Sequence, residues 1–158
     1  HGIADVEGLS THLVKHAEAA GLAPSNVVLE ITERVAVTAW NDFRKRIDDL
    51  RALGYGVAID DMGAGYSSLH SVAEVEPDFL KFDIALVRDI HLSPIKRGLL
   101  ESLVLLAERI DAQVIAEGVE KEEEFETLRE MKVPFGQGYL FSPPTSLAFH
   151  VPDGPPVR

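Results

Sequence analysis

The sequence predicts an α/β fold in which helices cover a parallel sheet. Five short apolar runs alternate with amphipathic stretches along the 158 residues, and this alternation is typical of repeated strand–helix units. The composition, 46% hydrophobic and 26% charged, suffices for one buried core, whereas two large domains would need a longer chain. We therefore expect one domain over residues 1–150 and a disordered tail over 151–158.

Changes in hydrophobic periodicity define the elements in chain order. Amphipathic stretches end at Gly21 and Gly54, as helices commonly do, and Pro94 suits the first turn of a helix. Short apolar runs of strand length lie between these stretches. The expected helices are 5–20, 40–53, 68–75, 94–110 and 121–131, and the expected strands are 27–31, 56–60, 79–82, 113–116 and 135–140.

Charge and residue usage exclude several classes of partner. A net charge of −11 opposes binding to long nucleic acids, whose phosphates attract Lys and Arg. No apolar stretch reaches the roughly 18 residues of a membrane span, and the first residues do not resemble a leader, so we expect no membrane contact. Cysteine is absent, which fits a cytoplasmic location and leaves oxygen or imidazole to hold any metal ion.

Asp60 and Asp61 stand side by side at the end of an apolar run and before a glycine-containing loop. Two like charges 4 Å apart repel by about 4 kcal/mol at an effective dielectric near 20, so a proton or a cation must neutralise one of them. Hard divalent ions prefer carboxylate oxygens, which favours a metal site. The pair alone is equally consistent with capping and turn aspartates.

Polar residues also interrupt the other expected strands near their carboxyl ends. Side chains alternate between the two faces of a strand, and the carboxyl ends of strands form the active site in barrels of repeated strand–helix units. One face of the sheet would therefore collect three acids, a lysine and an amide, whereas each residue taken singly could be a strand-end cap. These residues are Glu30, Asp60, Lys81, Glu117 and Gln137.

Lys81 admits two interpretations within this set. Its compact ammonium could orient an attacking water or stabilise developing charge on a phosphoryl group. Alternatively, it could form a salt bridge to the neighbouring acids without a chemical role.

Five segments between residues 27 and 143 resemble the EAL domain of bacterial cyclic di-GMP phosphodiesterases, in the order and at the spacing of that family. They correspond to the family patterns E-x-T-E, D-D-F-G-x-G-Y-S-S-L, K-[IL]-D, A-E-G-V-E and Q-G-Y-x-F-x-x-P. In this chain they begin at Glu30, Asp60, Lys81, Ala116 and Gln137. Met62 replaces the usual phenylalanine of the second segment, and Ala64 stands where threonine is common.

The resemblance implies a TIM-barrel-like fold that hydrolyses cyclic di-GMP to linear pGpG with two Mg²⁺ or Mn²⁺ ions. It implies that Glu30, Asp60 and Asp61 bind metal, that Lys81 lies beside the attacking water, and that Glu117 binds metal or acts as a general base. The residues that the resemblance assigns to substrate binding or loop support are Glu33, Asp83, Glu120 and Gln137. A homodimer, an upstream regulatory domain and the bacterial cytoplasm are expected on the same basis.

The Glu-Ala-Leu motif that names the family is absent, and the family's asparagine ligand and phosphate-contacting arginine would precede residue 1. A complete barrel has about 250 residues, so we expect a partial EAL domain, an incomplete barrel of about five strands with two sheet edges. We expect this chain alone to have little or no hydrolytic activity. Two alternatives stay open: a catalytically inactive domain that acts as a cyclic di-GMP receptor or protein-interaction module, and an unrelated barrel hydrolase with the same metal chemistry.

Overall fold

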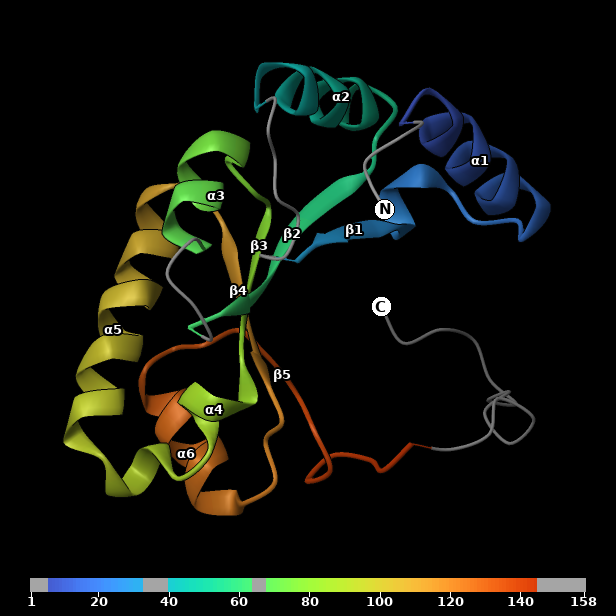
Figure 1. The fold of residues 1–158 in the computed structure, drawn as a ribbon. Helices are drawn as coiled ribbons and strands as arrows, with labels where there is room; N and C mark the ends of the chain where they lie inside the picture. Colours follow the sequence, from blue (N-terminus) through green and yellow to red (C-terminus); the bar gives the residue numbers. More distant parts are fainter. Residues whose placement is uncertain (1–5, 33–39, 64–67, 145–158) are drawn as a thin grey trace.

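The computed structural model describes residues 6–32, 40–63 and 68–144. Over these residues it contains one parallel sheet of five strands, arranged in the order in which they occur in the chain (Figure 1). The strands are β1 (Val28–Ile31), β2 (Gly56–Met62), β3 (Phe79–Phe82), β4 (Gln113–Glu117) and β5 (Phe135–Gln137). The predicted α/β class with five parallel strands is therefore confirmed. Within the described residues the sheet stays open, with β1 and β5 at its edges.

Six α-helices and two short 3₁₀ helices accompany the described strands. The α-helices are α1 (Val6–Ala19), α2 (Trp40–Ala52), α3 (Ser68–Val75), α4 (Ile84–Val87), α5 (Pro94–Arg109) and α6 (Glu122–Glu130), and the 3₁₀ helices are η1 (Pro24–Asn26) and η2 (Ile90–Leu92). The five long helices match the predicted ranges within one residue at each end. The periodicity did not predict η1, α4 or η2, which are too short to show a repeating pattern.

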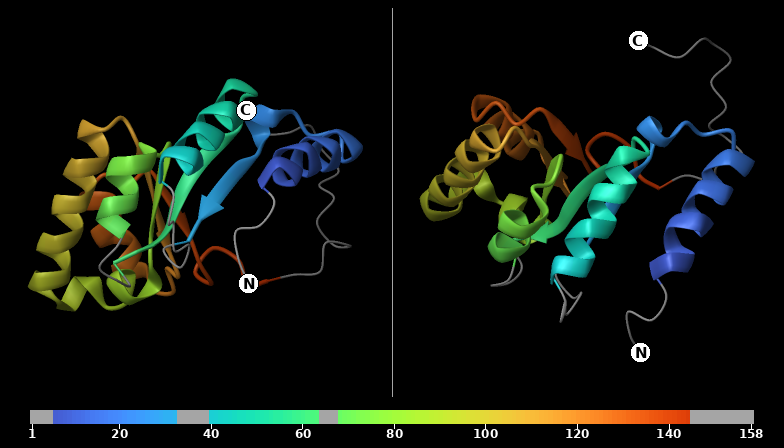
Figure 2. Two further views of the ribbon diagram at one scale, coloured as in Figure 1. Left: turned by 45° about the horizontal axis from the view of Figure 1, so that its top comes forward. Right: turned by 90° about the horizontal axis from the view of Figure 1, so that it is seen from above.

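The predicted alternation of faces along the strands is confirmed by burial. The residues expected to meet the helices are each at most 2% exposed, and they are Val57, Ile59, Leu80, Phe82, Val114 and Ala116. They form one core with apolar side chains of α2, α3 and α5, helices that lie along the same side of the curved sheet (Figure 2). The polar strand-end residues consequently lie on the opposite face, away from this core.

Strand β2 differs from the prediction because it continues through both aspartates to Met62. From Ile59 to Met62 the paired residue on β3 advances only from Leu80 to Phe82, so β2 contains one extra residue, a β-bulge. Asp61 adopts a left-handed φ of 57° there, which aspartate tolerates better than most residues. The bulge keeps Ile59 and Met62 buried while both intervening aspartates stay only partly buried.

Strand β5 ends at Gln137 and is therefore shorter than the predicted strand at 135–140. At Gly138 a Cβ atom would lie 2.2 Å from the Val119 carbonyl oxygen, so the two backbones are in direct contact. The chain then turns, and the Leu140 amide donates to that same carbonyl at 3.0 Å. The predicted role of Glu33 and the predicted tail at 151–158 concern residues outside the described part of the chain.

Asp78 joins three strands at the amino-terminal end of the sheet. Its amide donates to the Val57 carbonyl and its carbonyl accepts from the Gln113 amide, both at 2.8 Å. Its Oδ2 atom accepts from the Val57 amide at 2.8 Å and lies 3.8 Å from Arg51 Nε. The side chain therefore satisfies a strand-end donor and takes part in one loose ion pair.

We predict that D78A lowers the free energy of unfolding by about 1–3 kcal/mol, because it leaves the Val57 amide without its acceptor. D78N keeps an oxygen acceptor and loses mainly the Arg51 pair, which should cost less than about 1 kcal/mol because the pair is half-exposed. Urea unfolding of the two variants measures both values. Equal losses would show that the ion pair, and not the hydrogen bond, is the important interaction.

Candidate active site

The Lys81 ammonium gathers carboxylates from three different strands. Its Nζ atom lies 2.9 Å from Glu30 Oε1, 3.0 Å from Asp60 Oδ1 and 2.9 Å from Glu117 Oε1. These acids belong to β1, β2 and β4, and Lys81 itself belongs to β3. The predicted convergence of the strand-end residues is thus present in the structure.

Gln137 adds the fifth strand to this group. Its Nε2 atom donates to Glu117 Oε1 at 2.6 Å, and Glu117 is paired with Gln137 in the register between β4 and β5. Neighbouring parallel strands place their carboxyl ends at one edge of the sheet, which explains why residues far apart in sequence meet there. We call this group the acid–lysine centre, and its members are Glu30, Asp60, Lys81, Glu117 and Gln137.

The acid–lysine centre has an excess of negative charge in a partly buried position. Three carboxylates share one ammonium, and the Lys81 side chain is only 7% exposed while that of Glu30 is 51% exposed. Burial on its own would lower the pKa of Lys81, but its contacts with the carboxylates of Glu117, Glu30 and Asp60 together raise this pKa above its ordinary value. Lys81 therefore remains a cation at neutral pH.

The raised pKa also fixes how Lys81 affects stability. A lysine whose pKa is higher in the folded state stabilises the fold fully at any pH below its pKa in the unfolded state, here 10.5. This stabilisation is lost only as the pH rises through the pKa of the folded state. Between neutral and moderately acidic pH, Lys81 itself consequently introduces no pH dependence.

The donor set fits a hard divalent cation. The side-chain atoms available as metal ligands are carboxylate oxygens, which Mg²⁺ and Mn²⁺ prefer. Asp60 Oδ1 is buried and, among the described residues, has no hydrogen-bond donor of good geometry, although Lys81 Nζ is 3.0 Å away. In the described part of the chain, no group of three or more acidic or histidine side chains could hold a metal ion by itself.

Three further predicted site residues in the described part of the chain, Asp61, Asp83 and Glu120, are not among the acids paired with Lys81. Asp83 caps α4 by accepting from the Ala85 amide at 2.7 Å, and Glu120 accepts from Arg88 at 3.0 Å. Asp61 occupies the extra position of the β2 bulge, and no ion pair between described residues involves it. The metal-binding and substrate-binding roles of these residues stay predictions.

Glu124 is a buried acid in the first turn of α6. It is 1% exposed, and it accepts from the backbone amides of Asp89, Glu120 and Lys121. Burial on its own would raise the pKa of Glu124, but these three donors lower it below its ordinary value of 4.5. Its contribution to stability is therefore present above that value and is lost as the pH falls through the folded pKa. Glu124 stands at the capping-box position three residues after the N-cap, which is a local signal for its bond to the Lys121 amide but not for its bond to Asp89.

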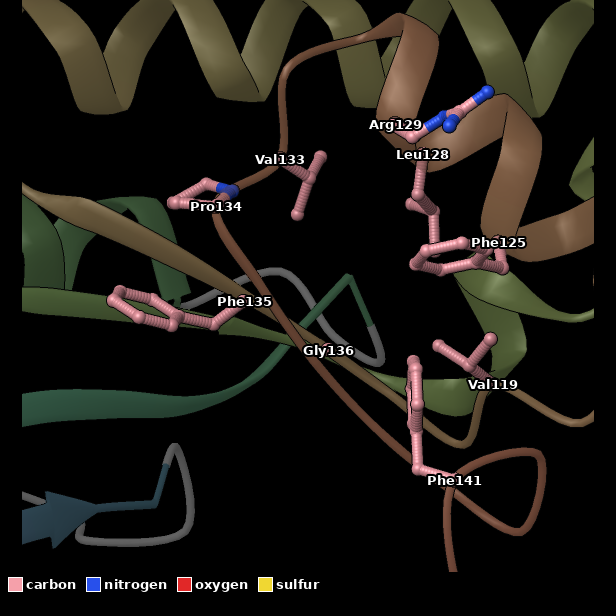
Figure 3. Close-up of a pocket in the computed structure, with 9 residues that line it drawn as sticks. All are labelled: Val119, Phe125, Leu128, Arg129, Val133, Pro134, Phe135, Gly136 and Phe141. Carbon is pink, nitrogen blue, oxygen red and sulfur yellow. The ribbon is translucent and has the colours of Figure 1, made fainter. Parts of the chain in front are cut away.

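A pocket of about 220 Å³ lies elsewhere, between α6 and β5. Figure 3 shows Phe125 and Leu128 of α6 facing Phe141 across this space. The rings of Phe125 and Phe141 pack edge to face, with their centroids 5.7 Å apart. Its lining contains one charged residue, Arg129, and includes no member of the acid–lysine centre. This pocket therefore contains neither the carboxylates nor the lysine that converge at the strand ends.

A parallel α/β sheet with charged residues at the carboxyl ends of its strands is typical of barrel-type domains, whose sites lie at the strand ends. The model of the EAL domain family matches residues 4–144, and the chain belongs to this family. None of the helices in the described residues is long and apolar enough to cross a membrane.

Three relatives illustrate the similarity. Cyclic di-GMP phosphodiesterase NbdA of Pseudomonas aeruginosa is 38% identical over 136 residues, which cover 85% of this chain and 17% of NbdA. BlrP1 of Klebsiella pneumoniae, in complex with calcium and cyclic di-GMP, matches with a TM-score of 0.78 and 42% identity over 85% of this chain and 34% of BlrP1. BlrP1 was also solved with manganese and cyclic di-GMP.

The EAL domain of Mycobacterium smegmatis DcpA matches with a TM-score of 0.83 and 33% identity, over 88% of this chain and 62% of the DcpA structure. The chain therefore spans less than two thirds of each of these relatives.

We predict that K81M lowers the free energy of unfolding at pH 7 by about 3–5 kcal/mol, because it leaves partly buried carboxylates without their shared cation. Because the pKa of Lys81 is raised in the folded state, the loss should shrink only as the pH rises above the unfolded value of 10.5. K45M, which removes an exposed lysine of α2, is the matched control and should change stability by less than about 0.5 kcal/mol. Urea unfolding across the pH range measures these values, and equal losses for K81M and K45M would contradict the importance of the Lys81 contacts.

Proposed function

We propose that the protein containing this chain is a divalent-metal-dependent phosphodiesterase that hydrolyses cyclic di-GMP to linear pGpG. The observation that carries this proposal is the convergence of three carboxylates on Lys81 at the carboxyl edge of the sheet. Membership in the EAL domain family and the cyclic di-GMP complexes of BlrP1 support the choice of substrate.

In this proposal the carboxylates of Glu30, Asp60 and Asp61 hold the metal ions, Mg²⁺ or Mn²⁺. Bound divalent ions would lower the pKa of water to about 7 and neutralise charge on the phosphoryl oxygens. Asp60 is the best placed of the three because its Oδ1 atom is buried and short of a donor. Asp61 follows it on the bulge, where both side chains avoid the apolar face.

Lys81 and Glu117 act on the attacking water and on the phosphate. The Lys81 ammonium stays protonated, so it stabilises negative charge as the phosphoryl oxygens gain it. Glu117 contacts both Lys81 and Gln137, which orients its carboxylate either to accept a proton from the water or to bind metal. Gln137 and Glu120 border the substrate, and Glu33 and Asp83 support the surrounding loops.

The cellular setting is part of the same proposal. The protein acts in the bacterial cytoplasm, where cyclic di-GMP is its partner, and it works as a homodimer through the EAL domain. The net charge of −11 favours a small ligand whose phosphates are neutralised by metal ions over a long nucleic acid.

We predict that the full-length protein linearises cyclic di-GMP in the presence of Mg²⁺ or Mn²⁺, and that E117Q lowers kcat by about 10²–10⁴-fold, as expected for loss of a general base. E108Q removes an exposed acid of α5 and should leave kcat unchanged. The measurement is chromatographic detection of pGpG with and without the metal ion.

Two results would contradict the proposed activity. Binding of cyclic di-GMP without turnover would identify the protein as a receptor, and the absence of both binding and turnover would exclude this substrate. An equal kcat for E117Q and the unchanged protein would show that Glu117 takes no part in the reaction.

A further inference from the structure

Glu124 is a buried acid that the proposed chemistry does not use. It occupies the first turn of α6 and is 1% exposed, whereas its neighbours Glu122 and Glu123 are exposed. Acids near a helix start usually remain solvated and interact weakly with the helix dipole. A fully buried carboxylate needs strong hydrogen bonds to offset its loss of solvation, so its contacts identify what it holds in place.

The Glu124 carboxylate connects two loops that follow different strands. Its Oε2 atom accepts from the amides of Glu120 at 3.0 Å and Lys121 at 3.1 Å, in the loop after β4. Its Oε1 atom accepts from the amide of Asp89 at 2.8 Å, between α4 and η2 and therefore after β3. The bond to Asp89 crosses 35 residues of sequence, so Glu124 does more than cap its own helix.

The loop after β4 begins directly at Glu117 of the acid–lysine centre. Gly118 has a left-handed φ of 68°, and a Cβ atom there would lie 2.3 Å from Ile84 of α4. The Val119 amide donates to the Gln137 carbonyl at 3.0 Å. Residues 118–121 therefore contact α4 on one side and β5 on the other before they reach Glu124.

Two ion pairs bridge the same two loops at the surface. Arg88 Nη2 lies 3.0 Å from Glu120 Oε1, and both side chains are exposed. Lys121 Nζ pairs with Asp89 Oδ1, and both side chains are roughly half-exposed. Exposed pairs of this kind contribute at most about 1 kcal/mol. Among these three links between the loops after β3 and β4, the Glu124 carboxylate is the buried one and consequently the strongest.

We propose that Glu124 is a positioning residue for the acid–lysine centre. By joining the loops that follow β3 and β4, it fixes where Glu117 stands relative to Lys81 and Gln137. This inference rests on the proposed function, because it assigns Glu124 a role in the same reaction. Glu124 acts through Glu117 and touches neither the substrate nor the reacting water.

The test compares three variants of the full-length protein. E124A removes both acceptor oxygens, and E124Q keeps the shape but leaves either the Asp89 amide or the Glu120 and Lys121 amides facing an NH₂ group. E123Q removes the same charge from the exposed neighbour and is the matched control. We expect kcat for cyclic di-GMP to fall about 10–100-fold in E124A, to fall less in E124Q, and to be unchanged in E123Q, with KM altered less than kcat.

Two readouts do not depend on activity. Amide hydrogen exchange at Asp89, Glu120 and Lys121 should accelerate in E124A and in part in E124Q, and the ¹⁵Nζ resonance of Lys81 should shift in both. E123Q should change neither. These measurements decide the positioning role even if the unchanged protein fails to hydrolyse cyclic di-GMP, so failure of the proposed function and failure of this inference are distinguishable.

V104A is the control for effects that arise from lost stability alone, because it removes core methyl groups on α5. We expect V104A to lower the free energy of unfolding while leaving kcat and the Lys81 resonance unchanged. The proposal is overturned if E124A leaves the Lys81 resonance and the three amide exchange rates unchanged. It is also overturned if V104A, while still folded in the assay, lowers kcat as much as E124A does.

Discussion

The contact on which this molecule depends is the Lys81 ammonium within 3.0 Å of carboxylates from three other strands. Three acids at one sheet edge would repel one another strongly in a partly buried position. A single cation on the central strand offsets that repulsion and draws the ends of β1, β2 and β4 together. The excess of negative charge that remains is what suits the edge to divalent cations and to the phosphates they neutralise.

The rest of the fold supplies the geometry that this contact needs. The unbroken strand order sets Lys81 in the middle of the sheet, and the face packed against α2, α3 and α5 is the one opposite to the acid–lysine centre. The bulge at Asp61 allows two consecutive acids to avoid the core. Asp78 at one end of the strands and Glu124 beyond the other end tie neighbouring strands and loops to one another.

The sequence predicted the strands and the acid–lysine centre because both follow from local rules. A period of two along each strand identifies which residues share a face, and parallel strands bring their carboxyl ends together. The bulge at Asp61 was not predictable in this way, since it depends on the register against β3. The roles of Glu124 and Glu120 depend equally on distant partners, Asp89 and Arg88, which no local pattern reveals.

The most direct test of the account is to locate Mn²⁺ on the full-length protein by paramagnetic line broadening in NMR spectra. If the strand-end carboxylates form a divalent-cation site, small amounts of Mn²⁺ should selectively broaden the side-chain resonances of Lys81 and Gln137. Resonances of the exposed part of α5, such as those of Glu108, should stay sharp. Broadening confined to other acidic surfaces, with Lys81 and Gln137 unaffected, would contradict the central claim.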